Sequence, residues 1–185
     1  MPYKERANVC PPSHVRWLNS PLRNLIHNPK KIMGAYVHLG DTVIDLGCGG
    51  GFFTVALAKM VGKNGRVIAI DLQEEMLAFT RDFAAKHGVI EKISLHQCSS
   101  DHIGLADLKA NFALAFYVVH EVPDRERFLQ EVAELLLPEA CFLMIEPKHH
   151  VKDFDHELRL AEKAGFQPVR QIKVSGSKAM LFRMG

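Results

Sequence analysis

The sequence from Val43 onward reads VIDLGCGGGFFTVALA, which places four glycines and a cysteine between an apolar run and a segment with helical spacing. Glycines in such a turn let a ligand lie directly against the main chain, because no Cβ intervenes. Two nucleotide-binding patterns fail here: no Gly-Lys-Ser/Thr follows, and GxGxxG fits Gly47 and Gly49 but meets Phe52 at its last position. The stretch therefore predicts a ligand-binding loop of another kind.

Side chains suited to acid–base chemistry are common, since the chain contains 10 histidines among 185 residues. Their pKa near neutrality suits a general base. The 4 cysteines lie far apart without a CxxC pair, which predicts free thiols in a reducing compartment. A metal site can be drawn from Cys10, His14, His149 and His150, but adjacent histidines rarely face one ion and the spacing is not diagnostic. We therefore expect no metal.

Apolar runs of strand length alternate with segments of helical apolar spacing along most of the chain. The expected strands are residues 42–47, 66–71, 92–97, 112–119 and 141–146, and the expected helices are residues 52–62, 74–88 and 125–138. The strands are apolar on both faces, which suits a sheet covered by helices on both sides. Right-handed crossovers then give a doubly wound, mostly parallel α/β sheet.

The two ends of the chain depart from this alternation. Residues 153–165 predict a helix, and residues 166–184 predict two strands joined across Ser175–Ser177 as an antiparallel hairpin. Near the other end, Asn28 can cap a helix that has Pro29 at its first position. We expect a short N-terminal lid over residues 1–38, across the carboxyl edge of the sheet, and a seven-stranded α/β domain over residues 39–185.

The stretch DLGCGGG, an acidic residue followed by glycines and then a helix, resembles the first motif of class I S-adenosylmethionine-dependent methyltransferases. The order of elements and the closing hairpin are similar to the seven-stranded domain of that family, from about Asn28 to the C-terminus. The resemblance implies S-adenosylmethionine as the cofactor. Asp45 would then accept a hydrogen bond from its ammonium group, with Gly47, Gly49 and Gly51 against its amino-acid end.

The resemblance also implies where the rest of the cofactor lies. Asp71, followed by Leu72, is expected to accept hydrogen bonds from the ribose hydroxyls, although it could instead cap the next helix. The family commonly has a Gly-Asp-Ala after the third strand, whose Asp accepts from the adenine amine. This chain has Cys-Ser-Ser there, so either Ser99 or Asp101 is expected to take that role. Phe116 belongs to a segment that passes the methionine part of the cofactor.

Three histidines are candidate catalytic residues because they fall in segments expected at the carboxyl edge: His14, His120 and His149. His120 ranks first, since it follows the strand whose end faces the sulfonium in this family. We expect it to orient the acceptor or take its proton, with a pKa lowered by the neighbouring cation. A solvated loop histidine is the alternative at each position, and Tyr117 is equally consistent with a core aromatic and a pocket residue.

The methyl acceptor is expected to be a small molecule. The NPPY or DPPY motif of amino-methylating enzymes is absent after the fourth expected strand, and the chain looks closest to methyltransferases that act on quinones, thiols or metalloids. A net charge of +2 gives no general attraction to nucleic acid or anionic membranes, so neither is expected as a partner.

No apolar run reaches membrane-spanning length, and we expect a cytoplasmic location. Two alternatives stay open. The basic residues among the first 31 could direct the enzyme to RNA, or the protein could bind S-adenosylmethionine without catalysis.

Overall fold

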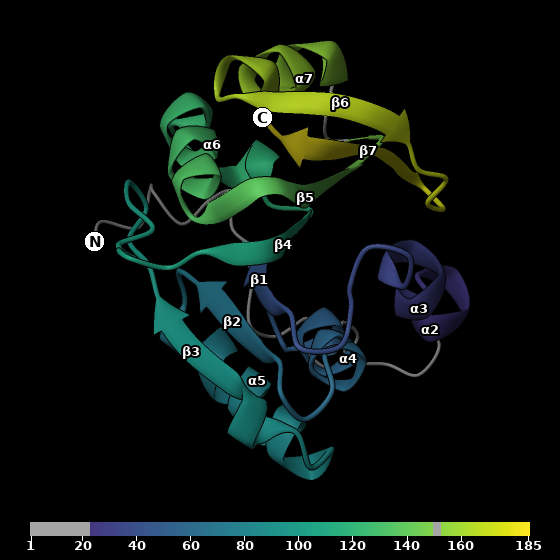
Figure 1. The fold of residues 1–185 in the computed structure, drawn as a ribbon, viewed down its shortest axis with the longest axis vertical. Helices are drawn as coiled ribbons and strands as arrows, with labels where there is room; N and C mark the ends of the chain where they lie inside the picture. The colour runs from purple at the N-terminus through teal and green to yellow at the C-terminus, as the bar shows by residue number, and fades with distance from the viewer. Residues whose placement is uncertain (1–22, 150–152) are drawn as a thin grey trace.

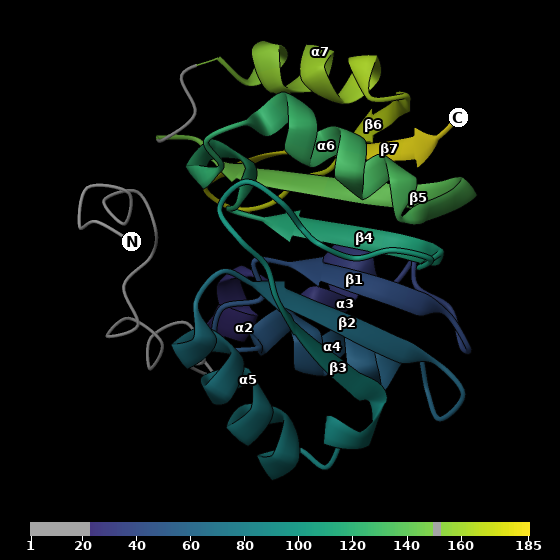
Figure 2. The same cartoon turned by 90° about the vertical axis from the view of Figure 1, so that its left-hand side faces the viewer.

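A computed structural model describes residues 23–149 and 153–185 of the protein. Its centre is a seven-stranded sheet in the order β3-β2-β1-β4-β5-β7-β6 (Figure 1). The strands are β1 Thr42–Leu46, β2 Arg66–Asp71, β3 Ile93–Gln97, β4 Ala110–Phe116, β5 Leu136–Pro147, β6 Phe166–Gln171 and β7 Ser177–Met184. Only β7 runs against its neighbours, β5 and β6 (Figure 2). This arrangement confirms the predicted doubly wound sheet with its antiparallel hairpin.

Helices cover both faces of this sheet. One face carries α2 Arg23–Ile26, α3 Pro29–Met33, α4 Phe52–Met60 and α5 Glu74–Lys86, and the other carries α6 Arg125–Glu134 and α7 Phe154–Lys163 (Figure 1). Two 3-10 turns, η3 Ile90–Lys92 and η4 Val119–Glu121, complete the described elements. Alternate residues of β1 supply the two cores: Val43 packs with the α4 side, whereas Ile44 and Leu46 pack with the α6 side.

The boundary between α6 and β5 differs from the prediction. We expected the helix to continue to Pro138, but α6 ends at Glu134 and β5 begins at Leu136. The run LLLP is apolar enough for either element, and pairing of Leu136 with Ala110 of β4 decides in favour of the strand. An irregular register beside Ala110 and a positive φ of 64° at Glu139 mark a bulge, which lets the strand accommodate a proline.

The described part of the N-terminal segment packs against the rest of the fold. Asn28 caps α3 as predicted, because its side chain accepts a hydrogen bond of 3.1 Å from the main-chain N–H of Lys31. Residues 1–22 lie outside the described chain, so the division into a lid over 1–38 and a domain over 39–185 stays a prediction. Within the described residues, no helix combines the length and apolar character that crossing a bilayer requires.

Candidate active site

A cavity of about 820 Å³ opens at the carboxyl ends of the parallel strands, where doubly wound folds place their ligands. Its size lies within the roughly 300–1,000 Å³ typical of small-molecule sites. Most of the predicted site residues line it: Asp45, Gly47, Gly49, Asp71, Leu72, Ser99, Phe116 and His120. The fold therefore brings residues from four separate strand ends to one site.

The glycine loop between β1 and α4 needs glycine at three positions. Gly47, Gly49 and Gly51 have φ values of 62°, 53° and 87°, in the left-handed region that favours glycine. A Cβ on Gly47 would lie 2.4 Å from Cγ2 of Val118, and one on Gly51 would lie 3.0 Å from Oγ1 of Thr80 on α5. Gly51 does not line the cavity. The structure thus places Gly51 in the packing of α4 on α5, and Gly47 and Gly49 beside the ligand space.

Asp45 is the penultimate residue of β1, a buried carboxyl with 2% of its surface exposed. Burial raises its pKa to about 7, although the hydrogen bond from Thr54 and the positive charge of Arg23 both act to lower it. The Thr54 hydroxyl donates to Oδ2 of Asp45 at 2.5 Å. Asp45 is therefore only partly ionised near neutral pH, and a cation bound beside it would favour the ionised form.

This burial predicts that cofactor binding depends on pH. The ammonium group of the cofactor should lower the pKa of Asp45 below about 7, so that binding releases a proton at acid pH. Affinity should then rise with pH and level off above 7, with a slope approaching about tenfold per pH unit below that point. Calorimetric titration between pH 5.5 and 8 measures this slope, and Asp45→Asn should remove it. An equal slope in the Asn variant would assign the proton to another group.

Asp71 ends β2, and its two carboxylate oxygens hold main-chain groups on either side. Oδ2 accepts a hydrogen bond from the N–H of Gly49 at 2.8 Å, and Oδ1 accepts one from the N–H of Gln73 at 3.0 Å. Asp71 therefore fixes the glycine loop and Gln73, which is the N-cap residue of α5, so it supports the start of α5 from outside the helix. An ionised carboxylate offers about four lone-pair positions, so the ribose role is compatible with these bonds and stays a prediction.

We expect Asp71→Asn to weaken cofactor binding about tenfold to hundredfold, because ribose hydroxyls lose charge-assisted bonds. The asparagine keeps the size of the side chain and one acceptor oxygen, whereas alanine would leave the N–H groups of Gly49 and Gln73 unsatisfied. Calorimetry gives the dissociation constant and thermal melting reports the capping role separately. A lowered melting temperature with an unchanged dissociation constant would restrict Asp71 to capping.

The two candidates for the adenine end lie together. The Ser99 hydroxyl donates to Oδ1 of Asp101 at 2.8 Å, and both residues line the cavity. This hydrogen bond is the main cause that lowers the pKa of Asp101, which keeps its carboxylate ionised. Glu131 of α6 holds the next residues, accepting a 2.6 Å bond from the N–H of Ile103 and pairing with Nδ1 of His102 at 2.6 Å. No local pattern indicates Glu131, because it lies on a helix far along the chain from these residues.

His120 lies in η4, directly after β4, and forms a buried pair that the sequence did not predict. Its Nδ1 bonds Oε2 of Glu146, a fully buried residue on β5 whose Oε1 accepts from the N–H of Val119 at 2.9 Å. Nε2 of His120 lies 4.0 Å from Oε1 of Glu121. Because Nδ1 faces a carboxylate, the neutral ring carries its proton on Nδ1, and Nε2 is the acceptor.

The His120 pKa is predicted to fall beside the cofactor cation, and in the protein without cofactor other charges act on it. Burial does lower it, but the hydrogen bond and charge of Glu146, together with the charge of Glu121, outweigh burial and raise the pKa. The prediction considered only the cofactor cation. Glu146 reaches His120 from a neighbouring strand, 26 positions along the chain.

The remaining candidates divide between the cavity and the surface. Tyr117 lines the cavity and also packs against the core on the α4 side, and its hydroxyl bonds Oγ of Ser177 at 2.7 Å, so it serves both interpretations. His149 is exposed in the turn after β5 and does not line the cavity. His14, Cys10 and His150 lie outside the described residues. Among those described, no group of three or more histidine, cysteine or acidic side chains is arranged to hold a metal ion.

The chain is similar in sequence to known methyltransferases. A family model described as a methyltransferase domain matches residues 38–177. The chain is 32% identical over 110 residues to the demethylmenaquinone methyltransferase of Lactobacillus johnsonii, covering 60% of this chain and 45% of that protein. It is 33% identical over 146 residues to the juvenile hormone acid O-methyltransferase of Bombyx mori, covering 77% of this chain and 50% of that protein. The chain thus spans half or less of the length of these curated relatives.

Solved structures agree on the fold. A SAM-dependent methyltransferase from Aquifex aeolicus superposes with a TM-score of 0.85 and 27% identity, over 95% of this chain and all of that one. The [4+2]-cyclase SpnF also superposes, with a TM-score of 0.70 and 14% identity, over 88% of this chain and 80% of that one. This likeness shows the shared fold alone. With the glycine loop, the sheet order and the matched domain in agreement, the chain belongs to the class I methyltransferase family, whose cofactor is S-adenosylmethionine.

Proposed function

We propose that this chain transfers a methyl group from S-adenosylmethionine to a small-molecule acceptor held beside His120. The observation that carries the proposal is one cavity whose wall includes Asp45 and Asp71 at the cofactor end and His120 beyond them. A single concave site of this size suits a small ligand beside the cofactor.

The bound cofactor supplies a methyl group activated on a sulfonium sulfur. The protein has to orient the acceptor, exclude water and remove a proton where the nucleophile carries one. Glu146 holds Nδ1 of His120, which leaves Nε2 as the atom that takes this proton. The side chain of His120 is only 15% exposed, so little solvent surrounds the base when it takes the proton from the acceptor, and the proton then leaves the ring to solvent.

The described thiols favour an organic acceptor over a metalloid. Burial raises the pKa of Cys48 well above its ordinary value and raises the pKa of Cys98 to about 11, although both residues line the cavity. Protonated thiols are poor ligands for a soft centre, which thiolates bind. An arsenite methyltransferase from Halobacterium salinarum is a relative, 32% identical over 111 residues, but this chain covers only 28% of it. We therefore place quinone-like, thiol and carboxylic acid acceptors first.

A panel of acceptors tests the proposal. Purified protein with S-adenosylmethionine should form S-adenosylhomocysteine when a phenolic quinol, a thiol or a carboxylic acid is added. The rate of S-adenosylhomocysteine formation with each compound identifies the chemical class of the acceptor. Turnover with RNA alone would support the RNA-directed alternative, and RNA affinity should then fall steeply with salt because counterions compete. Cofactor binding without turnover on any acceptor would support the non-catalytic alternative.

A further inference from the structure

We infer that Arg125 and Glu157 are positioning residues that hold the turn carrying His120 in the wall of the cavity. This inference rests on the proposed function, in which His120 takes a proton from the acceptor. Arg125 is the first residue of α6 and lines the cavity. Glu157 lies on α7, does not line the cavity, and has only 1% of its side chain exposed. The pair therefore connects a buried residue behind the cavity wall to the turn that the reaction uses.

The Arg125 guanidinium joins two partners from different elements. Its Nη1 donates to Oε1 of Glu157, and its Nη2 donates to the main-chain oxygen of His120 at 3.2 Å. The rigid fork of a guanidinium suits two such bonds from one side chain, whereas an ammonium group lacks this geometry. A positive charge in the first turn of a helix is opposed by the helix dipole, so the charge of Arg125 does not stabilise α6. The two contacts account for its position.

The turn that carries His120 begins in a strained conformation and needs support from its surroundings. Tyr117 has a φ of 64°, in the left-handed region that is unfavourable for residues other than glycine. Glu146 accepts a hydrogen bond from the N–H of Val119 at 2.9 Å and bonds Nδ1 of His120. Arg125 then holds the main-chain oxygen of His120. His120 is thus fixed at its ring by β5 and at its main chain by α6.

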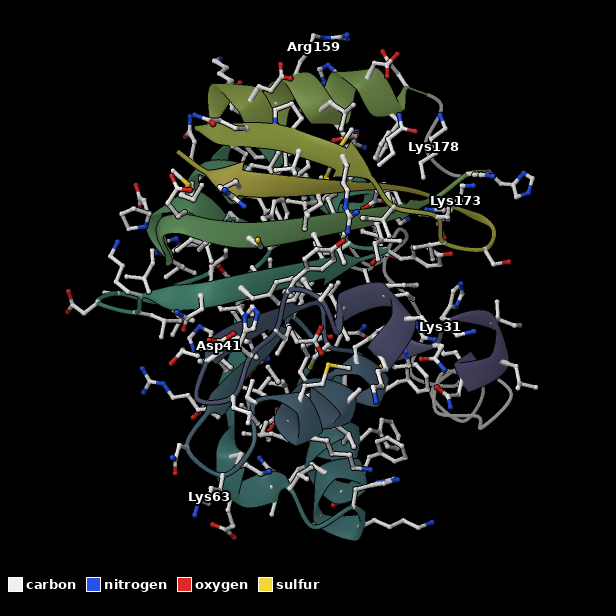
Figure 3. The ribbon with its side chains drawn as sticks, turned by 45° about the vertical axis from the view of Figure 1, so that its right-hand side comes forward. Lys31, Asp41, Lys63, Arg159, Lys173 and Lys178 are labelled. Atoms are coloured by element: carbon white, nitrogen blue, oxygen red, sulfur yellow. The ribbon has the colours of Figure 1, made fainter. Side chains whose placement is uncertain are left out.

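The burial of Glu157 indicates that the pair does more than stabilise the packing of α7. Burial raises the pKa of Glu157, although the charge of Arg125 acts to lower it. Within the described part of the chain, Oε2 of Glu157 is buried without a hydrogen-bond partner. A buried ion pair of this kind is often no more stabilising than apolar residues of similar volume. Arg159, on the same helix, instead points away into solvent, with 63% of its side chain exposed (Figure 3).

The charge of Arg125 also acts on the His120 ring. Burial lowers the pKa of His120, Glu146 of β5 and Glu121 of η4 raise it, and Arg125 of α6 lowers it. Loss of the Arg125 charge should therefore raise this pKa, because one of the two effects that oppose the carboxylates is removed. Loss of the whole turn would instead separate His120 from Glu146 and lower the pKa. The direction of the change thus distinguishes a positioning role from a general structural one.

A double substitution tests the inference without leaving a lone buried charge. Arg125→Met with Glu157→Leu replaces the pair by apolar side chains of similar size, so the melting temperature should be retained. Methyl transfer to a protonated acceptor, measured where the His120 ring is deprotonated, should slow about tenfold to hundredfold because the base is displaced. NMR titration of the His120 ring, assigned with His120→Asn, should show a raised pKa. Arg125→Lys keeps the charge without the fork, so it should lose rate and retain the wild-type pKa.

The matched control is Lys163→Met with Glu126→Gln, which removes an exposed ion pair between the same two helices. Nζ of Lys163 lies 2.5 Å from Oε1 of Glu126, and neither residue lines the cavity. This variant should keep the wild-type rate and the wild-type pKa of His120. An unaffected rate in the Arg125–Glu157 variant of an active protein, or a His120 pKa that does not rise, would overturn this inference alone. Wild-type protein that transfers no methyl group to any acceptor would overturn the proposed function.

Discussion

Gly49→Val should reduce the affinity for S-adenosylmethionine by more than about hundredfold, because a β-branched side chain would combine backbone strain with loss of ligand space. Gly49 has a φ of 53° and lines the cavity. Its N–H donates to Asp71 at 2.8 Å and its oxygen accepts from the Thr80 hydroxyl at 2.8 Å. A shift of this residue therefore also displaces the carboxylate expected to bind the ribose. Calorimetric titration with the cofactor measures the loss.

Gly88→Val is the matched control for this substitution. Gly88 follows α5 with a φ of 66°, so valine meets similar backbone strain there, but a Cβ at Gly88 contacts nothing within 4 Å. It also lies outside the cavity wall. The control should lower the melting temperature and leave cofactor affinity unchanged. Normal binding by Gly49→Val would show that the glycine loop does not hold the cofactor.

His120→Asn should slow methyl transfer to an acceptor that carries a proton by about hundredfold or more. Asparagine keeps a polar group of similar reach and removes the base that Glu146 orients. The loss should be small for an acceptor that is already ionised, such as a carboxylate or thiolate. Cofactor affinity should change little in either case, and steady-state rates with a matched pair of acceptors measure the difference.

The pH profile gives an independent check on His120. Glu146 and Glu121 raise its pKa in the protein without cofactor, and only the deprotonated ring accepts a proton. The wild-type rate should therefore rise with pH as the His120 ring loses its proton and then level off, with the rise at lower pH in the cofactor complex than in the protein without cofactor, whereas the Asn variant should lack this rise. His149→Asn, at an exposed residue outside the cavity, should retain the wild-type profile. Full activity of His120→Asn at every pH, on a protonated acceptor, would exclude the general base.

Local sequence signals predicted the sheet and most of the candidate residues that line the cavity. The glycine loop, the strand that ends at Asp71 and the cap at Asn28 depend on residues close together in the chain, so their patterns are visible without the fold. The boundary near Pro138 could not be read in this way, because pairing of Leu136 with β4 decides it. Short apolar runs are ambiguous until their partners are known.

The missed residues reach the site from distant elements. Glu146 contacts His120 because β4 and β5 are neighbours, and in the protein without cofactor its hydrogen bond and charge raise the His120 pKa against the effect of burial. The Arg23 guanidinium lies over the rings of Phe53 on α4 and Phe116 on β4, in the wall of the cavity. Pairings of this kind follow from tertiary packing, and no spacing within one segment indicates them.

Transfer of a labelled methyl group tests the central claim most directly. Purified protein is incubated with methyl-labelled S-adenosylmethionine and a whole-cell extract, which is then separated into small molecules, RNA and protein. We expect label in the small-molecule fraction, with far less after Gly49→Val. Label confined to RNA or protein, or no transfer by a protein that binds the cofactor, would contradict a small-molecule methyltransferase.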